Sequence, residues 1–416
     1  HTGTIPSKTL REAILYLSGF TQRTFYGKGY SVKEKISAQD LAFRVQAVVK
    51  RELEIVRAQL KRNEVTAIAG TAKFRDPHTL EIDTDTGPQL VTAEHVLIAC
   101  GTRPARSETI PVDGKRVCDS DQLLTVGQIP HDLIVIGAGV IGLEYASMMT
   151  ALNVKVTLID QRPHPLGFVD AEILDTLYYH MRRNGAVFRF GEKVVRVEID
   201  DRDRVVAVLE SGKRVHGEGL LYTVGRQANT DLVNAEAAGL KIDDRGRIGV
   251  NQFYQTAVPH IYAAGDVIGF PSLASSSMEQ GRLASCHMFG LACDSRPDLF
   301  PYGIYTIPEI SMVGKTEAEL TEAKIPYEFG VAKYDELARA QMIGDDTGLL
   351  KLLFDPDTKK LLGVHIIGER AAEILHIGQA VFSMGGTIEY FRDTVFNYPT
   401  LAEAYKVAAL DGLNKL

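Results

Sequence analysis

The stretch that decides the fold is LIVIGAGVIGLEYA, which spans Leu133–Ala146. An apolar run leads directly into Gly137, Gly139 and Gly142, whose G-x-G-x-x-G spacing is typical of a dinucleotide-binding turn between a strand and a helix. A second apolar run, VKVTLID, follows the predicted helix and ends at Asp160. These features together predict a strand–helix–strand unit and place the chain in the α/β class.

Each of the three glycines has its own predicted role in that turn. Gly137 would permit the tight turn, Gly139 would let the backbone approach a pyrophosphate, and Gly142 would let the helix pack closely against the strand. The free N–H groups and the positive dipole end at the start of the helix favour a phosphate group. The turn therefore predicts a small-molecule nucleotide as the binding partner.

Two charged residues at the end of the second strand bear on which nucleotide binds. Asp160 lies where a carboxylate accepts the ribose hydroxyls of NAD and repels a 2′-phosphate. Arg162, two residues later, could pair with the 2′-phosphate of NADP, and it could equally be a solvated loop charge. The sequence therefore predicts both NAD and NADP as substrates and leaves their relative affinity open.

The bulk properties limit the classes of function. A chain of 416 residues suggests roughly two to four domains. The formal net charge is −7 and the chain has no block of basic residues, so neither nucleic acid nor an anionic membrane surface is predicted as a partner. The longest apolar runs are too short and too rich in glycine to span a bilayer, and a cytoplasmic location is expected.

The cysteines give no metal or redox pattern. Cys100, Cys118, Cys286 and Cys293 form no C-x-x-C or C-x4-C pair, and none has a zinc-ligand partner at the usual spacing. All four are predicted to be buried small hydrophobic side chains. Neither a metal site nor a redox disulfide is predicted from this sequence.

The character of the sequence changes along the chain. Residues 1–65 are predicted to be mainly helical, and residues 66–105 to form short strands. From about residue 301 a further region begins, with a strand hairpin around Asp355–Asp357 and helices after it. The stretches HVLIACGTRP and GLLYTVGRQANT echo each other, since both end a strand in glycine and then reach arginine.

Five motifs in this order, TIPSK, ACGTRP, GAGVIGLEYA, GRQANT and YAAGDV, resemble those of the pyridine nucleotide–disulfide oxidoreductase family. The resemblance covers essentially the whole chain. It implies FAD-binding and inserted NAD(P)-binding Rossmann-like domains, followed by a C-terminal α+β dimerisation domain. The implied FAD-binding domain comprises residues 1–127 and 254–300, the NAD(P)-binding domain residues 128–253, and the dimerisation domain residues 301–416. The resemblance also implies a homodimer or higher homo-oligomer, and a first FAD glycine motif that lies upstream of His1.

The same resemblance implies several contacts to FAD. Asp266, in YAAGDV, would bind a ribityl hydroxyl of the flavin, because an acidic side chain after a strand can hold a sugar hydroxyl. Leu273 and Ala274 would open the next helix, whose N–H groups would face the flavin ring. Gly101 and Gly225, from the two strand-end glycine motifs, complete this part of the predicted cofactor site.

Lys8 and Glu144 are the two residues to which the resemblance assigns a catalytic role. Lys8 would lie near the reactive N5 of the flavin, and Glu144 would be its ion-pair partner. Such a pair would hold a positive charge beside the ring that receives a hydride. Thr4, directly before the same Ile-Pro-Ser-Lys segment, is also placed in the predicted cofactor site.

The chain departs at two positions from the pattern of the disulfide reductases in this family. Those enzymes carry two thiols spaced C-x4-C, with the second directly before Ile-Pro, and Thr4 occupies that position here. A hydroxyl is too weakly acidic to replace a thiolate. Tyr398 stands in the place of the acid–base histidine, with Glu403 at the matching distance, and a phenol with a pKa near ~10 is a poor proton shuttle at neutral pH. Tyr398 could equally pack at a dimer interface.

The stretches GTIPSK, YTIPEIS, FNYPT and AEAYKVAALDGLN are similar to the transhydrogenase branch of the family. The implied reaction is hydride transfer from NADPH to NAD⁺ through FAD, in ping-pong fashion and without a redox disulfide. Three alternatives stay open: a flavin-dependent NAD(P)H oxidase or diaphorase, a lipoamide-dehydrogenase-like reductase, and a non-catalytic nucleotide-binding dimerisation module. The missing thiol pair argues directly against the reductase.

Overall fold

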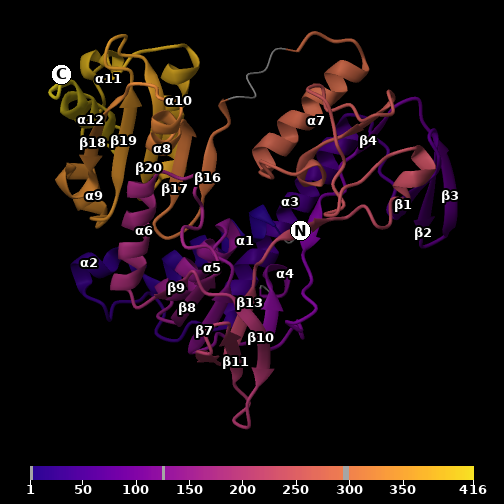
Figure 1. The fold of residues 1–416 in the computed structure, drawn as a ribbon, viewed down its shortest axis with the longest axis horizontal. Coiled ribbons are helices and arrows are strands. Elements are labelled where there is room, and N and C mark those ends of the chain that lie inside the picture. Colours follow the sequence, from indigo (N-terminus) through magenta and orange to yellow (C-terminus); the bar gives the residue numbers. More distant parts are fainter. Residues whose placement is uncertain (1–2, 124–126, 294–298) are drawn as a thin grey trace. The chain divides into compact units, whose positions relative to one another are not determined.

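The structure is a computed structural model that describes residues 3–123, 127–293 and 299–416 (Figure 1). Its contacts divide the chain into two compact units. Unit 1 comprises His1–Val48, Arg106–Thr223 and Asp298–Leu416, and unit 2 comprises Val49–Ala105 and Val224–Pro297. The three predicted domains are a separate, functional division of the chain, and their boundaries stay a prediction.

Unit 1 contains a parallel five-stranded sheet around the predicted strand–helix–strand unit. Its strand order is β6 (Val117–Asp119), β13 (Gly219–Tyr222), β7 (Asp132–Ile136), β8 (Lys155–Asp160) and β9 (Val187–Phe190). Helices α5 (Val140–Ala151) and α6 (Ala171–Arg183) follow β7 and β8. Strand β7 is buried from Leu133 onward, which explains its unbroken apolar run, since parallel strands are covered on both faces. The predicted strand–helix–strand unit is confirmed.

The N-terminal part of unit 1 is helical. It forms α1 (Thr4–Ser18), α2 (Arg23–Tyr26) and the first part of α3 (Ala38–Arg62). Helix α1 buries Leu10, Ala13 and Ile14, which recur at helical spacing, and it ends at Gly19 in the left-handed conformation. The predicted helical character of residues 1–65 is confirmed for the residues that the structure describes.

Unit 1 also contains an antiparallel five-stranded sheet near the C-terminus. Its strand order is β16 (Tyr302–Ile304), β17 (Ile310–Gly314), β20 (Leu361–Ile367), β19 (Leu349–Phe354) and β18 (Glu328–Lys333). The helices of this part are α8 (Glu317–Glu322), α9 (Ala338–Ile343), α10 (Ala371–Ser383), α11 (Glu389–Asp393) and α12 (Glu403–Leu413). The predicted hairpin is confirmed, because β19 and β20 pair antiparallel. Helix α12 packs directly on β18, where a Cβ on Gly330 would lie 1.9 Å from the carbonyl oxygen of Ala408.

Smaller elements complete unit 1. They are an antiparallel sheet of β10 (Val194–Ile199), β11 (Val205–Leu209) and β12 (Arg214–Gly217), the helix α4 (Ser120–Leu123), and the 3₁₀ turns η1 (Phe20–Gln22) and η5 (Tyr334–Glu336).

Unit 2 is built largely from short strands, as predicted for residues 66–105. It has an antiparallel sheet of β1 (Thr71–Asp76), β2 (Thr79–Thr84) and β3 (Gly87–Thr92), a parallel pair of β4 (Val96–Ile98) and β15 (Ile261–Ala263), and an antiparallel pair of β5 (Thr102–Pro104) and β14 (Arg226–Ala228). Its helical elements include η2 (Ala235–Ala238), η3 (Gly265–Ile268) and α7 (Ala274–Met288). The pairing of β5 with β14 joins the two stretches that echo each other in the sequence.

The prediction that all four cysteines are buried is wrong for three of them. Cys118, on β6, is buried, but Cys100, Cys286 and Cys293 are only half-buried. Cys100 follows the end of β4, Cys286 lies near the end of α7, and Cys293 lies beyond that helix. Residues at or beyond the end of a helix or strand are covered less completely than residues inside a sheet. The apolar character of these three cysteines therefore did not determine their burial.

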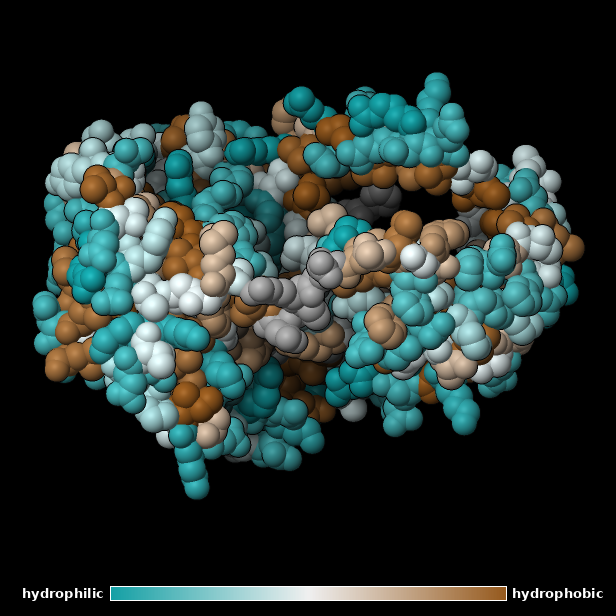
Figure 2. Space-filling view, turned by 90° about the horizontal axis from the view of Figure 1, so that it is seen from above, coloured by the Kyte–Doolittle hydropathy of each residue, from teal (hydrophilic) through white to brown (hydrophobic). Residues whose placement is uncertain are grey.

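The surface is mixed in polarity. On the face shown in Figure 2, hydrophobic residues are interspersed with hydrophilic ones. Among the described residues, no helix combines the length and the apolar character that crossing a membrane requires.

Candidate functional site

The glycine turn between β7 and α5 is closely packed. Gly137 has a φ of +101°, and its N–H donates to the carbonyl oxygen of Ile159 at 2.8 Å. A Cβ on Gly142 would lie 1.8 Å from the carbonyl oxygen of Gly137 and 2.7 Å from the hydroxyl of Thr223. That hydroxyl donates to the carbonyl oxygens of Ile136 and Gly137, both at 2.9 Å. Only glycine permits this approach of helix to turn.

The start of α5, unlike the packed side of the turn, has free space beside its backbone. Gly139 is the N-cap, with an extended backbone and no side-chain hydrogen bond to the helix. A Cβ added there would meet no atom within 4 Å. The first N–H groups of a helix lack partners within it, so this end offers donors and a positive dipole to a phosphate. The turn therefore fits the pyrophosphate of a dinucleotide.

Asp160 closes the same turn from the end of β8. Its carboxylate accepts the N–H of Ala138 at 2.7 Å, which ties it to the glycine turn. It also accepts the backbone N–H of Arg162 at 2.8 Å, and Nε and Nη2 of that side chain at 2.9 and 2.7 Å. Burial opposes ionisation of Asp160, but these hydrogen bonds outweigh it and lower the pKa of the carboxyl. The acidic residue is therefore held ionised beside the turn.

Arg162 is engaged by that carboxylate and is not free in solvent. Its side chain is 52% exposed while that of Asp160 is 5% exposed. The bidentate hydrogen bond raises the pKa of Arg162 against the effect of burial. The structure thus brings Gly137, Gly139, Gly142, Asp160 and Arg162 together in one place.

Lys8 and Glu144 form an ion pair between α1 and α5. Lys8 Nζ lies 2.9 and 2.8 Å from the two carboxylate oxygens of Glu144, whose side chain is 4% exposed. Removing one partner of a buried pair leaves an uncompensated charge and costs roughly 3–5 kcal/mol. This contact therefore fixes α1 against the helix that begins at the nucleotide turn.

The segment before β17 completes the surroundings of that pair. The N–H of Tyr305 donates to Glu144 Oε1 at 2.8 Å, and Lys8 Nζ lies 4.9 Å from the centre of the Tyr305 ring. The N–H of Ile307 donates to the hydroxyl of Ser147 at 3.0 Å. The sequence prediction missed Tyr305 and Ser147, although Tyr305 lies in the YTIPEIS stretch that carried part of the resemblance.

Thr4 begins α1 and is exposed. It precedes Lys8 by one helical turn, so both residues lie on the same side of the helix. The carbonyl oxygen of Thr4 accepts a hydrogen bond from the hydroxyl of Ser7 at 3.2 Å. The structure leaves its predicted contact with a cofactor untested.

Unit 2 gathers the remaining predicted residues around Asp266. The hydroxyl of Thr102 donates to Asp266 Oδ2 at 2.8 Å, and Arg226 Nε donates to the same hydroxyl at 2.7 Å. Gly101 and Gly225, which directly precede these two partners in the sequence, both have positive φ. The sequence analysis did not predict Thr102 or Arg226 as site residues. The only signal for them was the repeated pattern in which a strand ends in glycine and is followed by arginine.

Leu273 and Ala274 open α7 as expected. Leu273 is the N-cap, and no side chain caps the helix there. Its carbonyl oxygen accepts the hydroxyls of Ser276 and Ser277 at 2.9 and 2.8 Å, so these serines do not use up the first N–H groups of the helix. Together with Asp266, this helix start fits the polar groups of a flavin nucleotide.

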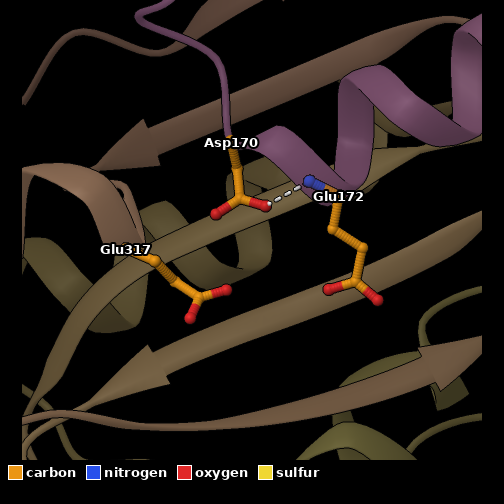
Figure 3. Close-up of side chains that lie close together, drawn as sticks. All are labelled: Asp170, Glu172 and Glu317. Atoms are coloured by element: carbon orange, nitrogen blue, oxygen red, sulfur yellow. Dashed lines mark hydrogen bonds between the residues drawn. The ribbon is translucent and has the colours of Figure 1, made fainter.

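A cluster of three carboxylates in unit 1 has the spacing of oxygen atoms that a metal site requires. Oxygen atoms of Asp170, Glu172 and Glu317 all lie within 4.8 Å of one another (Figure 3). The ammonium of Lys351, not drawn in that view, pairs with all three: it lies 3.1 Å from Asp170, 3.0 Å from Glu172, and also contacts Glu317. An internal cation thus occupies the cluster, which joins the start of α6 to β19 and α8.

Burial and pairing act in opposite directions on this lysine. Burial acts to lower the pKa of Lys351, but the hydrogen bond to Glu317 and the charge of Asp170 outweigh it and raise that pKa. The lysine therefore stays charged, and the cluster is an ion-pair network centred on its ammonium.

A cavity of about 610 Å³ in unit 1 lies apart from the predicted site residues. Its lining mixes cations and carboxylates and includes Arg11, His180 and Asp345. His180 Nδ1 lies 3.0 Å from the hydroxyl of Thr347, while Nε2 is buried without a hydrogen-bond partner among the described residues. Burial lowers the pKa of His180 to about 4, so the imidazole is neutral at pH 7.

Tyr398 and Glu403 lie in the C-terminal part of unit 1. Tyr398 is 71% exposed. Glu403 Oε2 is buried and accepts no hydrogen bond from the described residues, so Tyr398 does not hold this oxygen within the chain.

Comparison with known proteins agrees with this geometry. Residues 2–281 match the family model described as pyridine nucleotide-disulphide oxidoreductase, and residues 300–409 match the dimerisation domain of the same family. The chain belongs to the pyridine nucleotide-disulphide oxidoreductase family.

The similarity to known relatives covers the whole chain. It is 51% identical to the soluble pyridine nucleotide transhydrogenase of Mycobacterium tuberculosis over 100% of this chain and 89% of that protein. It is 47% identical to the protein of the same name from Colwellia psychrerythraea over 100% of this chain and 90% of that protein.

Solved structures show the same fold. LpdA from Mycobacterium tuberculosis superposes with a TM-score of 0.89 at 25% identity, over 98% of this chain and 90% of that one. The flavoprotein disulfide reductase RclA from Escherichia coli superposes with a TM-score of 0.86 at 24% identity, over 98% and 90% of the two chains.

Two alanine substitutions should separate packing from binding in the glycine turn. In Gly142→Ala the added Cβ meets the carbonyl of Gly137, so α5 must shift, and we expect a loss of roughly 1–3 kcal/mol in stability. In Gly139→Ala the Cβ meets no protein atom, so stability should change by less than about 0.5 kcal/mol. Nucleotide affinity should nevertheless fall at least about 10-fold, because the methyl group occupies the approach to the pyrophosphate. Urea unfolding and calorimetric titration with NADH measure the two effects, and unchanged affinity in Gly139→Ala would contradict the assignment of the turn.

Proposed function

We propose that the protein transfers hydride from NADPH to NAD⁺ through bound FAD, giving NADP⁺ and NADH in a ping-pong reaction. The observation that carries the proposal is identity of 51% and 47%, over the whole chain, to two soluble pyridine nucleotide transhydrogenases. The closely packed dinucleotide turn and the Lys8–Glu144 pair support it from the structure.

FAD would supply the two-electron carrier that accepts hydride from one nicotinamide and donates it to the other. Asp266, oriented by Thr102, would accept a hydrogen bond from a ribityl hydroxyl. The uncapped start of α7 at Leu273 and Ala274 would present N–H groups to the electron-rich side of the ring. Gly101 and Gly225 would shape the chain near these groups through their positive φ angles.

Lys8 would place a fixed positive charge at the reacting ring, and Glu144 would hold the lysine in position. Hydride transfer requires no general base, so Tyr398 in place of a histidine is no handicap to this reaction. Thr4 would offer a neutral hydroxyl in place of the thiol of the disulfide reductases. We therefore infer that electrons pass between nucleotides and are not delivered to a disulfide.

The direct test is a nucleotide-to-nucleotide assay on the full-length protein purified with FAD. NADPH and an NAD⁺ analogue whose reduced form absorbs at its own wavelength are mixed, with lipoamide, oxidised glutathione and an oxygen electrode in parallel. We expect fast reduction of the analogue, with slow oxygen uptake and inert disulfides. Oxygen uptake that matches NADPH consumption would replace this proposal with an oxidase, and fast disulfide reduction would replace it with a reductase.

Removing the charge of Lys8 should slow that reaction sharply. In Lys8→Met we expect the rate to fall about 100-fold, because a fixed charge at the reacting group is lost, and Lys8→Arg should restore part of it. Lys33→Met removes an exposed lysine of unit 1 that pairs with Asp40 at 2.6 Å, and it should leave the rate unchanged. The flavin spectrum of each variant shows whether FAD is retained, and an equal rate in Lys8→Met with full FAD content would refute the role of Lys8.

Arg162 would serve both nucleotides by changing partners. With NAD⁺ it stays on Asp160, and with NADPH its exposed side chain turns to the 2′-phosphate. Arg162→Gln should therefore raise the KM for NADPH about 10-fold, since a charge-assisted contact of about 1.4 kcal/mol is lost, and leave the KM for NAD⁺ nearly constant. Arg196→Gln, which removes another half-exposed arginine of unit 1, is the matched control. Equal increases in KM for NADPH and NAD⁺ would show that Arg162 does not bind the 2′-phosphate.

We further infer a homodimer formed by the region of residues 300–409. Val395, Met384 and Tyr398 are 89%, 87% and 71% exposed in the single chain, and all three lie within the range that matches the family's dimerisation domain. Val395→Glu combined with Tyr398→Glu should weaken dimerisation at least about 100-fold in Kd, through the loss of apolar burial. Leu232→Glu, at an equally apolar exposed position of unit 2, should leave the dimer intact by sedimentation velocity. A dimer of unchanged affinity in the double variant would place the interface elsewhere.

A further inference from the structure

Two thiols of unit 2 lie in direct contact. The sulfur atoms of Cys286 and Cys293 are 2.7 Å apart, and both residues are half-buried. Cys286 lies in the last turn of α7, and Cys293 lies on the segment that follows the helix. Neither residue belongs to the glycine turn, to the Lys8–Glu144 pair or to the group around Asp266.

The contact follows from the way α7 ends. Gly290 adopts the left-handed conformation with a φ of +65°. The N–H of Leu291 donates to the carbonyl oxygen of Cys286 at 2.9 Å, and the N–H of Gly290 donates to that of His287 at 3.3 Å. This hydrogen-bond pattern is the Schellman cap, which turns the chain back along the last turn of a helix. Cys293 is thereby brought beside Cys286 by local structure alone.

Arg282 makes the two thiols chemically unequal. It lies one helical turn before Cys286, and its Nη1 donates to the sulfur of Cys293 at 2.7 Å. Glu279 accepts Nε and Nη2 of the same guanidinium at 2.8 and 2.6 Å and so orients it. A guanidinium favours the thiolate form of the sulfur that it contacts. The hydrogen bond from Cys293, together with burial, raises the pKa of Cys286.

We propose that Cys286 and Cys293 are an oxidation site for hydroperoxides that closes reversibly into a disulfide. The thiolate of Cys293 attacks one peroxide oxygen, the O–O bond breaks, and the leaving hydroxide takes a proton to become water. Cys286 then attacks the resulting sulfenic sulfur, the S–S bond forms, and a second water leaves. Two thiols and one H₂O₂ thus give one disulfide and two waters, and a dithiol reductant reverses the change.

The other two cysteines serve as internal controls. Burial raises the pKa of the Cys118 thiol to about 11, and burial also raises the pKa of Cys100. Both thiols are therefore protonated at neutral pH and should react slowly with a peroxide. Selective oxidation of the pair can be judged within one protein, without any substitution.

The test uses the full-length, FAD-containing protein, reduced and then exposed to H₂O₂. Free thiols are blocked by alkylation, and tryptic peptides are analysed without reduction. Residues 283–315 form one tryptic peptide that contains both cysteines and no other, because trypsin does not cleave the bond between Arg296 and Pro297. We expect this peptide to lose two hydrogens and to escape alkylation, while Cys100 and Cys118 are fully alkylated, and dithiothreitol should restore both thiols.

Variants test the order of events. Cys286→Ser should stop at a sulfenic acid on Cys293 that dimedone captures, and Cys293→Ser should give no disulfide in this peptide. Arg282→Gln should slow closure about 10-fold, since the thiolate loses its cationic partner. Oxidation of Cys100 or Cys118 as fast as the pair, disulfides only between chains, or a pair that stays reduced under excess peroxide would each overturn the proposal.

Discussion

Much of unit 1 depends on how closely α5 approaches the turn before it. The space between Gly142 and the carbonyl of Gly137 excludes even a methyl group, and the hydroxyl of Thr223 binds the same carbonyl. Glu144 lies two residues further along the helix, so its carboxylate is positioned by the same contact. It in turn holds Lys8 and the N–H of Tyr305. The packing that shapes the nucleotide turn therefore also positions the charge to which we assign the hydride step.

The two ion pairs of this region differ in how easily they can open. Glu144 is nearly inaccessible, and separating it from Lys8 would strand a buried charge at a cost of roughly 3–5 kcal/mol. Arg162 is half-exposed, and exposed pairs contribute only about 0–1 kcal/mol. Asp160 keeps its hydrogen bonds from the N–H groups of Ala138 and Arg162 when the guanidinium leaves. One pair is thus suited to a fixed charge, and the other to an exchange of partners between substrates.

The sequence predicted the parts of the molecule that local rules determine. The glycine spacing, the apolar runs and Asp160 placed the strand–helix–strand unit and its turn correctly, because a strand of that composition followed by that spacing has few alternatives. The sequence predicted the hairpin β19–β20 from the Asp-Pro-Asp turn between its two strands. These elements need no knowledge of distant partners.

Contacts between distant or irregular segments could not be predicted in the same way. Lys351 appears in a strand of apolar residues, and its partners Asp170 and Glu317 come from other elements. Thr102 and Arg226 meet only because two short strands pair across more than a hundred residues. The sequence predicts Cys286 and Cys293 as separate buried residues. They lie side by side because the helix cap at Gly290, a glycine in the left-handed conformation, turns the chain back, and sequence spacing does not reveal that cap.

The distribution of charges and titrating groups also bears on the chemistry. A disulfide reductase must move protons to and from sulfur, and it needs a group that changes its protonation state near neutral pH. Lys8 pairs with Glu144, and Asp160 pairs with Arg162. Burial raises the pKa of Glu309 to about 7 and lowers that of His180 to about 4, and neither residue belongs to these ion pairs. Hydride transfer moves two electrons and one proton as a single unit, so a site of fixed charges, without a proton shuttle, is sufficient for it.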